Sequence, residues 1–323
     1  MRAAVIPAAG AMPAYTEFRN PVADGGLEVV QVVAAALSNF TKSRAAGSHY
    51  SSEGQYPLIP GVDGVGTTKD GRRVYFAMPE LPFGAMAEQA LVDVRRTVAV
   101  PDGLDHVAAA ALANPGMSCW AALVERAKFQ AGETVLINGA TGSAGSVAVQ
   151  MAKELGAKKV IVTGRKAEEL KALRRLGADE VIPFDLRPET AGGQEMFTEA
   201  LEAEFARGLD VVVDYLWGGS ARSIVAAVAK AVEGAHPVRF IQVGEASRET
   251  VELPAAALRS SAIQIMGSGL KSVPFGKLLD GIGHVFAMAA QGRLELPTRV
   301  VPLAAVAESW DAPGKPRLVF RIP

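Results

Sequence analysis

The chain has 323 residues, a formal net charge of −1 and one cysteine, Cys119. One hydrophobic core rarely organises so long a chain, so we expect two domains. The near-neutral charge gives no electrostatic basis for binding nucleic acid or an anionic membrane surface. A lone cysteine excludes an intrachain disulfide, and the cytoplasm is the expected compartment.

Two apolar segments resemble export or membrane signals. The first, Met1–Ala14, is broken by prolines and a glycine, and we interpret it as a first strand. The second, Val107–Val124, carries no charge. Because Asn114-Pro115-Gly116 stands in its middle, we expect two helical pieces rather than a membrane span.

The pattern of apolar residues changes along the chain. The first third predicts short strands at Glu28–Val33, Arg73–Phe76 and Ala90–Val92, between clusters of Gly, Pro and Asp. From residue 134 onward, strands and helices alternate. The predicted strands are Thr134–Asn138, Lys159–Thr163, Glu180–Ile182, Asp210–Asp214, Arg239–Val243 and Ala262–Met266, and the helices are Ser143–Leu155, Ala167–Leu176, Gln194–Ala206 and Ala221–Val232. A helix at Phe275–Gln291 and an apolar stretch at Leu318–Ile322 follow. The alternation predicts a doubly wound parallel sheet and an α/β fold class.

A glycine turn follows the first strand of this alternating region. Its register is Ala140-x-Gly142-x-x-Gly145, with alanine at the first position of the usual glycine fingerprint. Gly142 would let the backbone approach a diphosphate, and Gly145 would let helix and strand pack closely. The amides at the start of the helix would bind the phosphates. The segment predicts a dinucleotide site; a tight turn without a ligand is the alternative.

The end of the next strand indicates which dinucleotide binds. NAD enzymes usually place Asp or Glu there to bind the ribose hydroxyls. Here Gly164, Arg165 and Lys166 come first, and the first acid is Glu168. Because Arg grips phosphate in a bidentate fork, the segment favours the 2′-phosphate of NADPH. The alternative is that both cations are solvated.

The ordered motifs resemble the medium-chain dehydrogenase/reductase superfamily, in its zinc-independent quinone oxidoreductase and enoyl reductase branch. The motifs are Leu37-Ser38-Asn39 with Tyr50 eleven residues later, Tyr56–Gly66, Phe83–Glu88, Asn114–Trp120, the glycine turn, Leu155–Ala157 and Leu176–Asp179. The resemblance covers essentially the whole chain, and its order and spacing are more specific than any single motif.

This resemblance implies a GroES-like β-rich catalytic domain, residues 1–115 plus 270–323, with an inserted Rossmann cofactor domain, residues 116–269. The substrate and the nicotinamide would share the cleft between the domains. Family members commonly pair through the last cofactor-domain strand, here Ala262–Met266, so a homodimer is expected. The expected cofactor contacts are Ser118, Gly142, Ser143, Ala144, Gly145, Gly164, Arg165, Lys166, Val243, Gly244, Gly267, Ser268 and Gly269. Val243-Gly244 and Gly267-Ser268-Gly269 are included because loops in open α/β sheets meet ligands where strands end, although their glycines could simply make turns.

Zinc ligands of the related zinc branch are missing. Asn39 stands where that branch has a cysteine-type ligand, and Val62-Asp63 stand where it has a His-Glu pair. The four histidines show no ligand spacing. Without a metal electrophile, hydride transfer to an electron-poor quinone or enone is the expected reaction. Tyr50 is the candidate proton donor and Asn39 a supporting donor, although water could also supply the proton.

Other interpretations stay open for several of these residues. Tyr50 could be a surface aromatic, and Asn39 a turn or cap residue. Cys119 is expected to be a packed side chain rather than a nucleophile. Asp214 could support the cofactor loop or cap the next helix. No Tyr-x-x-x-Lys pattern of short-chain dehydrogenases is present, and no Lys follows the glycine turn as in a P-loop. A non-catalytic NADPH-binding sensor is the alternative function.

Overall fold

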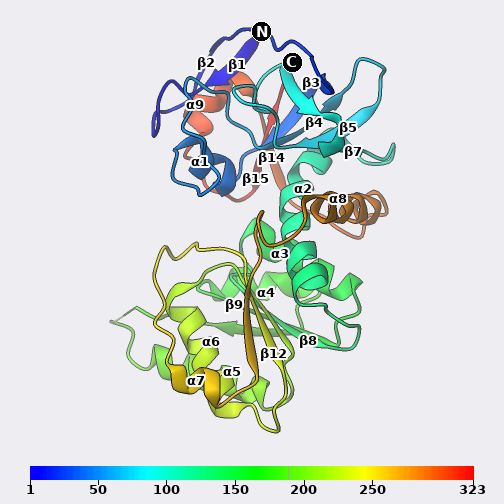
Figure 1. Ribbon diagram of the computed structural model, residues 1–323. Coiled ribbons are helices and arrows are strands. Elements are labelled where there is room, and N and C mark those ends of the chain that lie inside the picture. Colours follow the sequence, from blue (N-terminus) through cyan, green and yellow to red (C-terminus); the bar gives the residue numbers. More distant parts are fainter. Residues whose placement is uncertain (188) are drawn as a thin grey trace. The chain divides into compact units, whose positions relative to one another are not determined.

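The structure is a computed structural model that describes residues 1–187 and 189–323. Two compact units make up the chain: Met1–Asn114 with Ile282–Pro323, and Pro115–Gly281. We call them the β-rich unit and the parallel-sheet unit and describe each by itself (Figure 1). The chain passes between them within two helices, α2 (His106–Trp120) and α8 (Phe275–Ala290).

The β-rich unit contains a two-stranded and a seven-stranded sheet. Its strands are β1 (Arg2–Val5), β2 (Ala14–Glu17), β3 (Leu27–Ala36), β4 (Asp63–Thr67), β5 (Arg73–Ala77), β6 (Gln89–Asp93), β7 (Thr97–Ala99), β14 (Thr298–Pro302) and β15 (Arg317–Arg321). The larger sheet runs β14-β15-β3-β4-β5-β7, with β6 also paired to β3. Two short helices, α1 (Asn39–Ala45) and α9 (Val306–Ser309), accompany the sheets. The strands predicted in the first third of the chain are therefore confirmed.

Residues from both the N-terminal and the C-terminal segments form the core of the β-rich unit. Phe76 of β5 and Phe320 of β15 are fully buried in the same hydrophobic cluster as Ile6 and Met86. Antiparallel pairing of β15 with β3 brings the last strand onto the first long one. Burial of such side chains is the main stabilising term for a sheet of this kind.

The parallel-sheet unit has six strands in the order β10-β9-β8-β11-β12-β13. They are β8 (Thr134–Asn138), β9 (Lys159–Gly164), β10 (Glu180–Pro183), β11 (Val211–Asp214), β12 (Val238–Gln242) and β13 (Ile263–Gly267), and the helices are α3 (Ser143–Glu154), α4 (Ala167–Ala172), α5 (Gly193–Phe205), α6 (Gly218–Ala231) and α7 (Ala255–Arg259). All neighbouring strands are parallel. The doubly wound α/β prediction is confirmed, with boundaries within a few residues of those expected.

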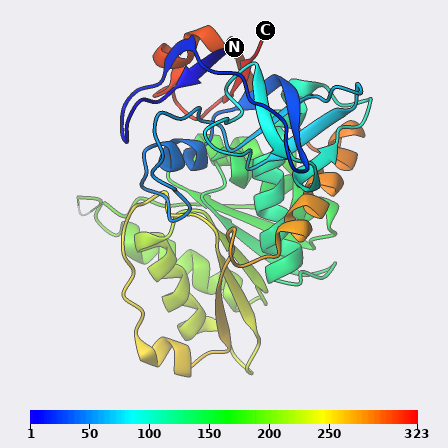
Figure 2. The same cartoon turned by 45° about the horizontal axis from the view of Figure 1, so that its top comes forward.

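Helices cover both faces of this sheet. The chain winds outward from β8 to β10 and then returns to β11 and winds the other way. Because such crossovers are right-handed, α3 and α4 lie on one face and α5 and α6 on the other (Figure 2). The strand order reverses between β8 and β11, and the carboxyl ends at such a reversal are where open α/β sheets bind ligands.

The predicted break at Asn114-Pro115-Gly116 is wrong. Helix α2 continues through Pro115 to Trp120 and then passes into a π-helical segment, Ala121–Arg126. Proline lacks an amide donor and its ring crowds the carbonyl four residues earlier, but here the preceding residues Ala109–Ala113 are buried. Packing therefore outweighs the local cost of the proline.

By length and composition alone, the stretch His106–Arg126 is apolar enough to cross a membrane. In the structure, 61% of its most apolar window is buried inside the protein. A core helix of a water-soluble fold meets the same criteria, so this stretch by itself indicates no membrane span.

Candidate dinucleotide site and substrate loop

The glycine turn lies between β8 and α3, at the carboxyl edge of the parallel sheet. Gly142 is the N-cap of α3 and has no side chain to accept hydrogen bonds from the first helical amides. The first turn of α3 also contains no acidic residue. The positive end of the helix dipole is therefore not neutralised by a carboxylate of its own first turn, which is the arrangement that accepts an anion.

Close packing explains Gly145. A Cβ at this position would lie 2.6 Å from Ala140 Cα and 2.6 Å from the Gly139 carbonyl oxygen. Gly142 differs, because a Cβ there would meet only the Gly139 carbonyl oxygen, at 3.6 Å. The two glycines therefore have separate roles: Gly145 is required by the fold, whereas the space beside Gly142 is open.

A buried polar network fixes the strand ends beneath this turn. The Asn138 amide donates to Asp214 Oδ1 at 2.7 Å and to Ser220 Oγ at 2.9 Å, and Thr163 donates to Asn138 Oδ1 at 2.6 Å. Burial raises the pKa of Asp214, although hydrogen bonds to the carboxylate oppose that shift. Networks of this kind are stable only when each member is satisfied, and they then rigidify the strand ends.

Asp214 also holds the chain that follows β11. Its carboxylate accepts from the amides of Leu216 at 3.0 Å and Trp217 at 3.0 Å. Trp217 has φ 63° and ψ −157°, a backbone region that is otherwise almost confined to glycine. The sequence leaves open whether Asp214 supports a loop or caps the next helix. In the structure its carboxylate supports the loop directly before α6.

The end of β9 carries the residues expected to select the cofactor. Gly164 is buried, while Arg165 and Lys166 are exposed. Lys166 pairs with Glu169 at 2.6 Å. Within residues 1–187 and 189–323, no ion pair engages Arg165. Arg165 is thus the more available of the two for an external phosphate.

The remaining predicted cofactor residues lie at or directly after the carboxyl ends of β12 and β13. The amides of Val243 and Gly244 donate to the Asp214 carbonyl at 2.8 Å and 3.1 Å, and Ser268 donates to the Gln242 carbonyl at 2.8 Å. Backbone hydrogen bonds thus connect the end of β11 to the segment after β12, and the end of β12 to the segment after β13. Ser118 lies in α2 of the same unit, beside Tyr215, whose pKa burial raises well above its usual value.

The two predicted catalytic residues lie in the β-rich unit. Asn39 is exposed and is the first residue of α1, so it is not the cap residue of that helix. The cap is its neighbour Ser38, whose Oγ accepts from the Thr41 amide at 2.9 Å. Tyr50 is 60% exposed, and its ring centroid lies 4.1 Å from that of His49.

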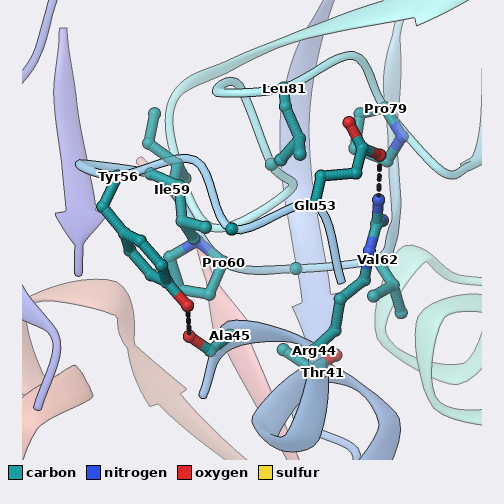
Figure 3. Close-up of a pocket in the computed structure, with 14 residues that line it drawn as sticks. Thr41, Arg44, Ala45, Glu53, Tyr56, Ile59, Pro60, Val62, Pro79 and Leu81 are labelled. Atoms are coloured by element: carbon teal, nitrogen blue, oxygen red, sulfur yellow. Dashed lines mark hydrogen bonds and ion pairs between the residues drawn. The ribbon is translucent and has the colours of Figure 1, made fainter. Parts of the chain in front are cut away.

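Arg44 fastens the segment that carries Tyr50 onto α1. Its Nη2 pairs with Glu53 Oε1 at 2.9 Å, and the Tyr56 hydroxyl donates to the Ala45 carbonyl at 2.8 Å (Figure 3). The Nε of Arg44 also donates to the Ser51 carbonyl, at 3.3 Å. A pocket opens beside these groups, with a cavity volume of about 30 Å³. That is room for one or two waters and far too little for a quinone.

Residues 144–279 match the family model described as "Zinc-binding dehydrogenase". The chain is 28% identical to the "Probable NADPH-dependent quinone reductase tdiC" of Emericella nidulans, over 96% of each protein. It is 31% identical to the chloroplastic NADPH-dependent alkenal/one oxidoreductase of Arabidopsis thaliana, over 48% of this chain and 44% of that protein. These similarities agree with the expected resemblance to the quinone oxidoreductase branch of the medium-chain dehydrogenase/reductases.

A solved structure has the same fold. The quinone oxidoreductase of Thermus thermophilus, which was also solved in complex with NADPH, superposes with a TM-score of 0.81 at 24% identity. The match covers 99% of this chain and 100% of that one. The similarity extends to both units and is not limited to the segment that the family model matches.

The description of the family model mentions zinc, which raises the question of whether side chains of this chain could bind a metal ion. Across residues 1–187 and 189–323, no group of three or more His, Cys, Asp and Glu side chains is placed to hold a metal ion. At the positions considered for zinc, Asn39 is exposed and Asp63 is 3% exposed.

Asp63, Tyr75 and Arg317 form a buried ionisable cluster that the sequence alone does not reveal. The Tyr75 hydroxyl donates to Asp63 Oδ2 at 3.1 Å. Burial raises the pKa of Asp63 to about 6, and Arg317 and the Tyr75 hydrogen bond oppose this rise. Burial also lowers the pKa of Arg317. Asp63 Oδ1 and two guanidinium nitrogens of Arg317 are buried without a hydrogen-bond partner in the described part of the chain.

The only cysteine is unreactive in this environment. Cys119 is fully buried in α2, and its Sγ donates to the Gly116 carbonyl at 3.2 Å. Burial raises the pKa of the thiol to about 12. The expectation that Cys119 is a packed side chain agrees with this position.

Proposed function

We propose that this chain is an NADPH-dependent oxidoreductase that transfers hydride to a quinone or an α,β-unsaturated carbonyl compound without a zinc ion. The observation that carries the proposal is the start of α3, where Gly142 as N-cap and a first turn without acids leave an anion-accepting helix end directly after β8. Two relatives named as NADPH-dependent reductases, one of quinones and one of alkenals and alkenones, support the same assignment.

NADPH would be held by the ends of successive parallel strands. The diphosphate would bind the amides of Ser143, Ala144 and Gly145. Gly164, Arg165 and Lys166 would lie at the 2′-phosphate end, and Val243, Gly244, Gly267, Ser268, Gly269 and Ser118 toward the nicotinamide. When bound, NADPH supplies the hydride, and the protein positions it. We propose that residues 1–115 plus 270–323 form the catalytic domain and that residues 116–269 form the cofactor domain.

Tyr50 is the proposed proton donor to the reduced substrate, with Asn39 as a supporting donor. A phenol is a suitable group, because it can give a proton to the enolate or hydroquinone anion that results from hydride addition. Water can replace Tyr50 in this step, because the Tyr50 side chain is largely exposed. Asn39 is exposed at the start of α1 and so presents its amide outward.

A cytoplasmic homodimer completes the proposal. Strand β13 is the edge of the six-stranded sheet and pairs with β12 on one side. Its outer edge can pair with β13 of a second copy, which would satisfy the unpaired backbone groups of an edge strand.

Turnover of NADPH tests the function directly. We expect the near-ultraviolet absorbance of NADPH to fall when the protein is mixed with a para-quinone or an alkenone, because both accept hydride without a metal. Dialysis against a zinc chelator should leave the rate unchanged. NADPH binding without turnover on either class of acceptor would favour a sensor, and no binding to folded protein would overturn the proposal.

Arg165→Ala should distinguish the two nicotinamide cofactors. Removal of a charge-assisted contact to the 2′-phosphate should raise the Kd for NADPH about 10- to 100-fold, while the Kd for NADH changes little. Fluorescence titration of both cofactors measures the difference. Lys171→Ala is the control, because Lys171 is an exposed cation in α4, the helix that follows Arg165, and it pairs with Glu168. An equal loss for both cofactors would contradict the NADPH assignment.

A further inference from the structure

The π-helical segment Ala121–Arg126 ends beside the loop that follows β13. The segment is defined by wide-turn hydrogen bonds such as that from the Ala127 amide to the Ala122 carbonyl, at 2.9 Å. π-Helical turns are rare, and many of them lie at functional sites because they redirect side chains. Here the last residue of the segment is an arginine whose side chain reaches a distant part of the chain.

Arg126 ties both ends of this loop to the helix. Its Nε donates to the Gly267 carbonyl at 2.8 Å, at the last residue of β13, and its Nη1 lies 3.4 Å from the Ser272 carbonyl. The loop is also closed on itself, since the Gly269 amide donates to Ser272 Oγ at 2.7 Å and the Ser272 amide to the Gly269 carbonyl at 3.0 Å. One guanidinium thus fixes where a compact turn begins and ends.

Apolar contacts support the same arrangement. Ala121 of the π-helical segment is buried together with Val273, directly after the loop, and Leu278 of α8. Met117, Leu270 and Phe275 pack around them. The loop is therefore packed against the helix on one side and bonded to Arg126 at both ends.

We propose that Arg126 is a positioning residue for the dinucleotide, acting through the loop Gly267–Ser272. This inference rests on the proposed function, because that loop follows a carboxyl end of the parallel sheet, where such sheets bind ligands. A loop that contains Gly267 and Gly269 would otherwise sample many conformations. Ordering it on binding would cost affinity, and Arg126 orders it in advance.

Two substitutions of Arg126 test the inference. Arg126→Met keeps the aliphatic stem and removes the donors, whereas Arg126→Lys keeps the charge and can reach one carbonyl. The control is Arg259→Met, at the exposed end of α7 near the start of β13, which is the opposite end of the same strand. The measurements are the Kd for NADPH, kcat with a quinone, the melting temperature and hydrogen exchange of the amides of residues 268–272.

We expect Arg126→Met to raise the Kd for NADPH about tenfold, with faster amide exchange confined to the loop. kcat at saturating NADPH should stay within about twofold, because the defect lies in binding. Arg126→Lys should recover part of the affinity, and Arg259→Met should match the wild type. These results would support a positioning role.

Other results would overturn it. An unchanged Kd with unchanged loop exchange would show that Arg126 orders nothing that NADPH uses. A lower melting temperature with faster exchange throughout the parallel-sheet unit would show a merely structural role. Failure of the proposed function is recognised separately, because the wild-type protein itself would then not bind NADPH in the same titration.

Discussion

Substituting alanine for Gly145 is expected to destabilise the fold, whereas the same change at Gly142 should spare the fold and lose the cofactor. At position 145 the added methyl would meet backbone atoms of Gly139 and Ala140 at 2.6 Å. Backbone cannot move aside as a flexible side chain can, so we expect a loss of about 3 kcal/mol in the free energy of unfolding. NADPH binding should be lost with the distorted turn.

At position 142 the methyl finds no such obstacle in the protein. It would lie 3.6 Å from the Gly139 carbonyl oxygen, an ordinary contact, and the backbone φ of −71° suits alanine. The free energy of unfolding should stay within about 0.5 kcal/mol of the wild type. The Kd for NADPH should nevertheless rise about 30-fold or more, because the diphosphate must approach this backbone closely.

Urea denaturation and NADPH titration of both variants separate the two effects. Each variant serves as the control for the other, because the chemical change is identical and only the position differs. If Gly142→Ala bound NADPH as tightly as the wild type, the diphosphate would not lie against this turn.

The second large effect is a pH dependence of stability that comes from Asp63. Burial raises the pKa of its carboxyl from 3.8 to about 6 in the folded protein. Because the folded state holds this proton more tightly than the unfolded chain does, the contribution of Asp63 to stability is complete below pH 3.8 and is lost as the pH rises through about 6. A shift of about two pKa units corresponds to roughly 3 kcal/mol.

Asp63→Asn removes this titration. We expect the wild-type free energy of unfolding, relative to that of the variant, to decrease by up to about 3 kcal/mol between pH about 4 and pH about 7. The difference between the proteins is the quantity to follow, because Asp93 and Asp185 have lowered pKa values and shift both proteins in the opposite direction. Denaturation curves at several pH values measure it. A difference that stays constant or increases with pH would contradict the assignment.

The parallel-sheet unit could be predicted from sequence in most of its detail. Strand β8 was predicted with its observed bounds, because Thr134–Asn138 is a short apolar run that ends at a glycine turn. Such buried strands have a local signature. The glycine turn was recognisable for the same reason, since its spacing reflects the backbone geometry of a single connection.

Features that depend on distant parts of the chain could not be predicted in this way. The sequence around Pro115 indicates a break, and only the burial of the whole helix explains why α2 continues. Asp63 and Arg317 come together because β4 and β15 both pair with β3. Arg126 reaches its loop through a π-helical turn that no periodic pattern signals. Helix α1 is not predictable from the sequence, because Phe-Thr-Lys-Ser after Asn39 gives no clear helical stripe.

The packing of Cys119 has a consequence for an enzyme that handles quinones. Quinones and enones are electrophiles that add to thiolates, so a reactive cysteine would be consumed by the compounds the enzyme is proposed to reduce. A fully buried thiol with its pKa raised to about 12 contains essentially no thiolate at neutral pH. Because this is the only sulfhydryl group in the sequence, the protein has no reactive thiol for these compounds to arylate.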